Sequence, residues 1–94
     1  MERKKLSAEE IVKGLAQISE WEALDDRLRK RFSFANFAES LEFVNKVGEI
    51  AEVADHHPDI TFGWGYAQFE ITTHDRGGIT DADFNLARKM DGLA

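Results

Sequence analysis

The sequence of 94 residues contains no cysteine and only one proline. The absence of cysteine excludes a disulfide framework, a thiolate nucleophile and a Cys-ligated zinc or iron–sulfur site. No apolar run approaches the ~20 residues that a membrane-spanning helix needs. Residues 1–5 (MERKK) are charged and lack the apolar stretch of a signal peptide. We therefore expect a soluble, cytoplasmic protein without a membrane partner.

Basic residues are also few, because 12 Lys and Arg stand against 18 Asp and Glu, for a net charge of −6. Phosphate binding requires a basic face, so no nucleic-acid partner is expected. A chain of this length predicts a single domain spanning residues 1–94, with one modest core. Oligomerisation adds stability to a domain of this size.

Helix caps and alternating hydrophobicity divide the first third of the chain. Ser7 and Glu10 form a capping box, which predicts a helix with one apolar stripe: Ile11, Leu15 and Ile18. Residues 21–24 are predicted to form a short strand and residues 25–26 a turn. The next strand alternates apolar Leu28, Phe32 and Phe34 with polar Arg27, Arg29, Arg31 and Ser33. We expect these arginines to face solvent.

A longer helix is predicted to begin at Asn36, which has an acidic residue three positions later. Gly48 weakens the helix interior by about 1 kcal/mol relative to alanine, so it predicts a close packing contact. Pro58 ends the helical run, because the residue before proline disfavours the helical region. The predicted inner face consists of Phe37, Leu41, Val44, Val47, Ala51 and Ala54. Phe43 and Ile50 widen this stripe and predict a second contact, with another subunit.

Residues 60–71 predict a β-hairpin with one buried face. Apolar residues occupy alternate positions on both sides of a turn at residues 63–65: Ile60, Phe62 and Trp64, then Ala67, Phe69 and Ile71. Thr80 and Asp83 then cap a last helix. The resulting order is α-β-β-α-β-β-α. It predicts an α+β fold in which helices pack on one face of a four-stranded antiparallel sheet.

The sequence has three histidines, His56, His57 and His74. Histidine has an unperturbed pKa of about 6.5, which suits proton transfer near neutral pH. His56 and His57 follow the predicted long helix, whose partial negative charge favours the imidazolium form that a general acid needs. His74 is predicted to close the second hairpin strand, facing away from Phe69 and Ile71. Because a helix end and a strand end of one layered domain can converge, one pocket can hold all three histidines.

These residues also have plain structural interpretations. A histidine pair before a proline is compatible with a polar helix terminus that satisfies its last carbonyl groups. Glu52 and Asp55 are compatible with surface acids, and Asp83 with a helix cap. Trp64 is expected to pack against or flank the hairpin turn, and Trp21 to lie in the core or at a pocket rim.

Rare residue types recur at fixed gaps in the second half of the chain. Residues 52–58 (EVADHHP) are followed at set distances by Trp64, His74 and Asp83. This spacing resembles the signature of the pterin-4a-carbinolamine dehydratase family. Further similar positions are residues 6–10, 31–34, 43, 51–52, 77–80 and 85–87. The resemblance covers nearly the whole chain, and it departs at Trp64, where members often have tyrosine.

The resemblance implies a fold that agrees with the α-β-β-α-β-β-α order, and it implies an activity. Family members expel the C4a hydroxyl of 4a-hydroxytetrahydropterin as water, which recycles the tetrahydropterin cofactor of aromatic amino acid hydroxylases. No metal or other cofactor is implied. By position, His56 and His74 are the expected acid–base pair, and His57 is a third active-site histidine that positions the pterin. The implied substrate-binding residues are Glu52, Asp55, Pro58, Thr72 and Thr73.

The implied partners are a pterin substrate, further copies of the chain and an aromatic amino acid hydroxylase. The family pairs sheets edge to edge in dimers and often packs dimers into tetramers through helices. A homodimer or homotetramer is therefore expected, and the wide stripe that includes Phe43 and Ile50 fits a contact between helices.

Two other functions stay open at this point. The first is a binding module without catalysis, because some animal members bind and stabilise dimers of a homeodomain transcription factor. Other relatives are assembly chaperones that have lost the histidine signature, whereas this chain retains all three histidines. The second is a metal enzyme, because His57, Asp59 and His74 formally resemble a two-histidine, one-carboxylate iron site. That pattern is short and leaves His56 without a role.

Overall fold

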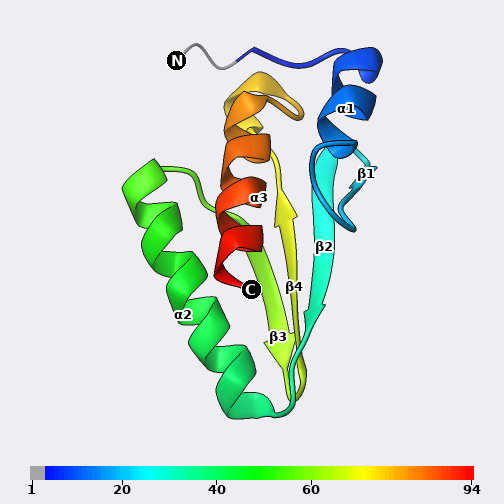
Figure 1. Cartoon of the computed structure of the whole chain (residues 1–94). Coiled ribbons are helices and arrows are strands. Elements are labelled where there is room, and N and C mark those ends of the chain that lie inside the picture. Colours follow the sequence, from blue (N-terminus) through cyan, green and yellow to red (C-terminus); the bar gives the residue numbers. More distant parts are fainter. Residues whose placement is uncertain (1–3) are drawn as a thin grey trace.

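The computed structural model describes residues 4–94, so the first three residues of the charged segment 1–5 lie outside the described residues. Within residues 4–94 the elements follow the predicted order: α1 (Ala8–Leu15), β1 (Glu22–Leu24), β2 (Arg27–Ser33), α2 (Phe37–Ala54), β3 (Asp59–Gly63), β4 (Tyr66–Ile71), a 3-10 turn η1 (His74–Arg76) and α3 (Asp81–Leu93). The strands form one antiparallel sheet in the order β1-β2-β4-β3. Figure 1 shows α2 and α3 side by side across one face of this sheet. The predicted α+β fold is confirmed.

Two tight turns close the two hairpins of the sheet. Asp25 and Asp26 join β1 to β2 with φ angles of 52° and 61°, a backbone twist that matches paired strands. Trp64 and Gly65 join β3 to β4, and Gly65 has a φ of 81°. The longest pairing joins the two hairpins, because β2 runs antiparallel to β4 from Leu28 opposite Ile71 onward. Strand β4 is therefore central, and the residues that follow it leave from the middle of the fold.

The core lies between the sheet and the helices. Phe32 of β2, Phe69 of β4 and Phe43 of α2 form an aromatic cluster. The Phe43 ring centroid lies 4.7 Å from that of Phe32 and 5.8 Å from that of Phe69. Aromatic pairs at such distances add to the free energy gained by burying their surface. The predicted buried face of the β4 strand, Ala67, Phe69 and Ile71, is confirmed.

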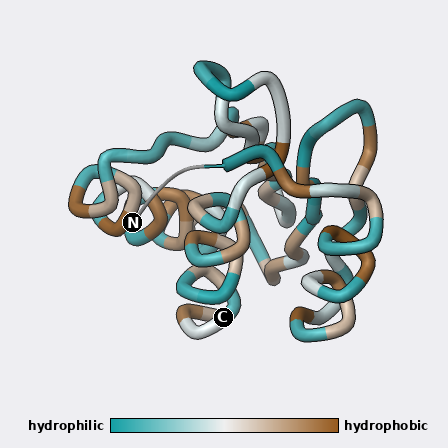
Figure 2. Tube along the Cα trace, turned by 90° about the horizontal axis from the view of Figure 1, so that it is seen from above, coloured by the Kyte–Doolittle hydropathy of each residue, from teal (hydrophilic) through white to brown (hydrophobic). Residues whose placement is uncertain are grey.

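The predicted inner face of α2 is confirmed at Val47 and Ala51 and is wrong at Phe37 and Leu41. The buried residues are Ser40, Phe43, Val47 and Ala51, whereas Phe37 and Leu41 remain 46% and 39% exposed. Figure 2 shows hydrophobic and hydrophilic residues alternating around the helical coils. Because apolar residues occupy so much of α2, their spacing alone does not determine which side meets the sheet. The sheet meets the side that carries Phe43, so this ring lies in the core of its own chain, and the partly buried Ile50 packs against that core.

A charged residue, Lys30 of β2, lies on the inner face of the sheet among apolar side chains. Lys30 lies two residues from both Leu28 and Phe32, so it shares their face of the strand. Its side chain is only 10% exposed. Its Nζ donates to Asp91 Oδ1 at 2.9 Å and to the Ser19 carbonyl oxygen at 2.8 Å. A buried charge that lacks such partners costs several kcal/mol, on the order of the desolvation penalty. Lys30 therefore ties β2 to the end of α3.

Trp21 joins the same contact from the loop before β1. Its Nε1–H donates to the two carboxylate oxygens of Asp91 at 3.0 and 3.1 Å. Its ring packs edge-on against Phe32, with centroids 6.3 Å apart. Of the two expected positions, core or pocket rim, Trp21 takes the core.

The predicted helix starts are all observed. Ser7 and Glu10 form a capping box, and the hydrogen bond from the Ser7 backbone N–H lowers the pKa of the Glu10 carboxyl. The Asn36 side chain accepts from the Glu39 backbone N–H. Thr80 and Asp83 form the capping box of α3.

The end of α2 differs from the prediction. The helix stops at Ala54 because Asp55 adopts a left-handed conformation, with a φ of 50°. This conformation caps helices and is tolerated by short polar residues. Pro58 lies beyond this cap, so the chain has already turned before the proline. His56 and His57 consequently lie after the helix, in the segment that leads to β3.

The glycines of the helices differ in the space around them. The expected close packing at Gly48 is not observed, since a Cβ atom built there meets nothing within 4 Å in the described chain. Gly14 is the tight position, because a Cβ atom there would lie 2.6 Å from Cζ of Phe84. Gly14 therefore permits the approach of α1 to α3.

We predict that Gly14→Ala destabilises the protein by about 1–3 kcal/mol, because the added methyl group overlaps the Phe84 ring. The matched control is Gly92→Ala, since Gly92 is likewise the penultimate residue of its helix but has open space around it. That variant is expected to gain up to about 1 kcal/mol from helix propensity. Urea unfolding measures both changes, and equal effects of the two variants would contradict the packing of α1 on α3.

Candidate active site

A pocket of about 260 Å³ lies where the chain leaves α2 and β4. Its lining residues are Asp55, His56, His57, Thr72, Thr73, His74 and Asp75. Three other hollows of the described surface, of about 310 to 350 Å³, contain no histidine. The pocket near α2 and β4 thus brings together the three histidines from two segments that are separated by a β-hairpin.

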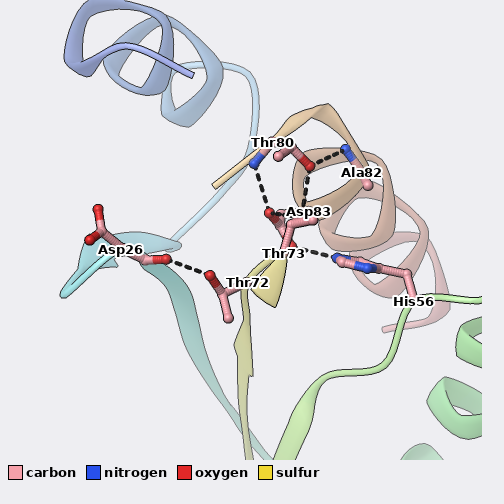
Figure 3. Close-up of polar contacts among 7 residues, drawn as sticks. All are labelled: Asp26, His56, Thr72, Thr73, Thr80, Ala82 and Asp83. Atoms are coloured by element: carbon pink, nitrogen blue, oxygen red, sulfur yellow. Dashed lines mark hydrogen bonds and ion pairs between the residues drawn. The ribbon is translucent and has the colours of Figure 1, made fainter. Parts of the chain in front are cut away.

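A buried carboxylate, Asp83, connects the elements behind the pocket. Its side chain is fully buried, and Oδ2 accepts from the Thr73 hydroxyl at 2.9 Å and from the Thr80 backbone N–H at 2.8 Å. Oδ1 lies 2.5 Å from Nε2 of His56. Figure 3 shows these groups converging on one carboxylate. The group holds together the start of α3, the exit of β4 and the segment after α2.

The chain between β4 and α3 folds back on itself to build this arrangement. Thr73 pairs with Gly78 through two backbone hydrogen bonds, of 3.0 and 3.4 Å, which enclose the turn η1. Gly77 provides the left-handed residue of that turn, with a φ of 71°. The turn places the Thr80 hydroxyl 2.8 Å from the Thr73 hydroxyl.

The three histidines have different surroundings. His56 is buried and held by Asp83, whereas His57 is exposed and its Nε2 contacts Oε2 of the exposed Glu52. An exposed pair of this kind contributes little to stability. His74 is exposed, and within residues 4–94 no side-chain hydrogen bond holds its imidazole. Rather than closing β4, it begins the turn η1, because the strand ends at Ile71.

The other predicted site residues lie at different distances from the pocket. Asp55 and Thr72 line it, although the Thr72 hydroxyl donates to the Asp26 carbonyl oxygen at 2.7 Å (Figure 3). Thr73 also contributes to the wall, but its side chain is buried against Asp83. Glu52 lies beside the pocket through its contact with His57, and Pro58 is not part of the lining.

Sequence reasoning missed Asp75, which lines the pocket, and the second role of Asp83. The sequence did contain a signal for Asp83, because this residue is predicted to cap the last helix. The interpretation as a helix cap is correct, but a cap uses only part of a carboxylate's capacity as an acceptor. The remaining oxygen meets His56.

The proposed iron-site pattern does not converge in this structure. Asp59 lies on the sheet, where its Oδ2 pairs with Nη1 of Arg27 at 3.1 Å. In the part of the chain that the structure describes, no three His, Cys, Asp or Glu side chains are arranged to hold a metal ion. Within the same residues, no helix has the length and apolar character needed to cross a bilayer.

The fold and this pocket define a small α+β protein in which three histidines line one pocket. The chain belongs to the family described as pterin 4 alpha carbinolamine dehydratase, whose sequence profile matches residues 4–93. The predicted family and its enzyme class, a hydro-lyase, are thereby confirmed.

Individual relatives agree with this assignment. The chain is 48% identical over 89 residues to a Rubrobacter xylanophilus protein provisionally named a pterin-4-alpha-carbinolamine dehydratase, covering 94% of this chain and 83% of that protein. A Brucella melitensis structure titled transcriptional coactivator/pterin dehydratase superposes with a TM-score of 0.93 at 27% identity, over 97% of this chain and 99% of that one. A pterin dehydratase-like RuBisCO assembly factor of the alpha-carboxysome has a TM-score of 0.66 at 26% identity, over 82% and 89% of the two chains.

We predict that Asp83→Asn destabilises the fold by about 3 kcal/mol, because the amide has one acceptor oxygen where the carboxylate serves three donors. Asp81→Asn is the matched control, since Asp81 is exposed in the same first turn of α3. It is expected to lose at most about 1 kcal/mol, from the weaker interaction with the helix dipole. Urea unfolding compares them, and similar losses would show that Asp83 acts only as an ordinary cap.

Proposed function

We propose that this chain dehydrates 4a-hydroxytetrahydropterin to the quinonoid dihydropterin by general acid–base catalysis from histidines. The observation that carries the proposal is one pocket lined by His56, His57 and His74, in a chain that belongs to the dehydratase family. The names of the relatives support the substrate class.

The reaction requires two proton transfers and no change of oxidation state. The bond from C4a to the hydroxyl oxygen breaks, and a proton from a general acid lets the oxygen leave as water. A general base removes the proton of the neighbouring ring nitrogen, and its electron pair forms the new double bond to C4a. Positioned acid–base groups typically contribute about 10²–10⁴-fold each to such a rate.

The surroundings of the histidines support distinct roles for them. His74 is exposed at the pocket and has no side-chain hydrogen bond within residues 4–94, so its imidazole is available to a substrate. His56 is held from behind by Asp83, which supports it as the second member of the pair. His57 and its partner Glu52 suit a positioning role, since a carboxylate can accept from pterin N–H groups.

The remaining predicted residues complete the proposed site. Asp55 and Thr72 are proposed to contact the pterin from the pocket wall, to which Thr73 also belongs. Pro58 is proposed to shape the turn that presents the two adjacent histidines. The product would be returned to the tetrahydropterin pool used by aromatic amino acid hydroxylases, one of which is a proposed partner.

We predict that purified protein accelerates the dehydration of 4a-hydroxytetrahydropterin and that His74→Ala lowers kcat by about 10²-fold or more, because one acid–base group is removed. A stopped-flow absorbance assay measures the rate. Glu49→Ala, exposed on α2 and outside the pocket, is the control and should retain the full rate. Full activity of the double variant His56→Ala, His74→Ala would exclude the proposed mechanism.

A second candidate function is a non-catalytic binding, assembly or transcriptional-coactivator module. It is favoured by two structural neighbours, whose titles name a transcriptional coactivator and a RuBisCO assembly factor. The same assay separates the two candidates, because a folded protein that does not accelerate dehydration would support the binding module.

We further propose that the chain forms a homodimer or homotetramer. Strand β3 is an edge of the sheet and carries Ile60, which is 37% exposed. Phe37 and Leu41 are exposed at the neighbouring side of α2, where Phe37 packs against Phe62 of β3. An unpaired edge beside apolar side chains is a surface that proteins commonly cover.

Sedimentation velocity tests this surface. We predict a dimer or tetramer for the wild-type chain and a shift toward monomer for Leu41→Glu, because a charge would be buried in the contact. Val53→Glu is the control, since Val53 is exposed on the same helix but lies roughly 120° around its axis from Leu41. A monomeric wild-type protein would contradict the proposal.

A further inference from the structure

We infer that Thr73 and Thr80 are positioning residues that act through Asp83, so that His56 is held by Nε2 and exchanges protons in the pocket through Nδ1. The catalytic consequence rests on the proposed dehydratase function. The arrangement of hydrogen bonds does not, and it can be tested without any activity.

The hydrogen bonds among Thr80, Thr73 and Asp83 allow only one assignment of donors and acceptors. Thr73 Oγ1 donates to Asp83 Oδ2 at 2.9 Å, and it lies 2.8 Å from Thr80 Oγ1. A threonine hydroxyl has a single proton. Since Thr73 donates its proton to Asp83, the Thr80 hydroxyl must donate to Thr73. The Thr80 oxygen in turn accepts from the Ala82 backbone N–H at 3.2 Å. The hydroxyls therefore form a directed chain that ends on the carboxylate.

This chain determines how the carboxylate is presented. Oδ2 of Asp83 accepts two donors, the Thr73 hydroxyl and the Thr80 backbone N–H. A carboxylate oxygen can accept both of these donors at once. With Oδ2 occupied, the plane of the group is set and Oδ1 is directed at His56, 2.5 Å from Nε2 (Figure 3).

The tautomer of His56 follows from this contact. A neutral imidazole has one N–H and one acceptor nitrogen, and the partner of one nitrogen selects the state of the other. Nε2 faces an acceptor, so it carries the proton. Nδ1 makes no hydrogen bond within residues 4–94. If Nδ1 were fully buried, it would be a buried polar atom without a partner, and the described residues contain no such atom. Nδ1 is therefore accessible from the pocket that His56 lines. Nδ1 is therefore the nitrogen that can accept a proton from a bound molecule.

Burial separates this role from direct substrate contact. Thr73 and Thr80 are 1% and 0% exposed, and both side-chain hydroxyls are used within the chain of hydrogen bonds. Substrate that fills the pocket meets the imidazole of His56 and not these hydroxyls. Loss of either hydroxyl should therefore affect the chemical step and leave substrate binding unchanged.

The first experiment measures the tautomer by ¹⁵N NMR of the imidazole groups in the substrate-free protein, at a pH where they are neutral. The wild type is expected to show His56 with a protonated Nε2 and an unprotonated Nδ1. Thr73→Val should give a mixture of tautomers, and Thr73→Ser should restore the single form. Thr61→Val, an exposed threonine on β3, is the control and should match the wild type. A wild-type His56 protonated on Nδ1 overturns the inference, and this result does not depend on any variant folding.

The second experiment measures dehydration by the same variants. Thr73→Val is expected to lower kcat at least about tenfold with KM unchanged, and Thr73→Ser to recover most of the rate. An unchanged kcat in Thr73→Val overturns the positioning role, as does a fall in kcat that serine fails to restore in a folded protein. If the wild type itself does not accelerate dehydration, the proposed function fails, while the NMR result still decides the tautomer.

Discussion

The buried carboxylate of Asp83 is the contact on which the arrangement of the site depends. An ionised group without exposure is strongly unfavourable unless donors surround it, and here the donors come from three different parts of the chain: Thr73 after β4, the Thr80 backbone at the start of α3, and His56 after α2. The two carboxylate oxygens of Asp83 take hydrogen bonds from all three segments. Separating the segments would therefore leave buried carboxylate oxygens without donors. The same contact thus stabilises the fold and assembles the pocket.

This constraint makes three chemically identical histidines unequal. His56 is buried and fixed through one ring nitrogen, His57 is paired with Glu52 at the surface, and His74 is exposed at the turn after β4. The proposed dehydration needs one group that delivers a proton and one that removes a proton, and His56 and His74 lie on two separate segments that meet at the pocket. A cavity of about 260 Å³ beside them is consistent with a small ring substrate.

Several features of the fold could be predicted because they depend on short stretches of sequence. The caps at Ser7, Asn36 and Thr80, the turn at Asp25 and the alternation in β4 all follow from local backbone and side-chain rules. The buried face of α2 could be predicted only in part, at Val47 and Ala51. Its apolar residues cover so much of the helix that the deciding factor was the space between the Phe32 and Phe69 rings, which Phe43 fills. The inward orientation of Lys30 could not be predicted either, because its partner Asp91 is 61 residues away in the sequence.

The sequence by itself determined the order of elements, the boundaries set by caps and turns, and the identity of the residues available for proton transfer, because propensity, periodicity and side-chain chemistry are local properties. The spacing of residues 52–58, Trp64, His74 and Asp83 also indicated the family to which the chain belongs. Only the tertiary structure decided which nitrogen of His56 meets Asp83, which side of α2 is buried and that Asp75 joins the pocket. These outcomes depend on contacts between residues distant in sequence, and such contacts are selected by packing and by the need to satisfy buried charge.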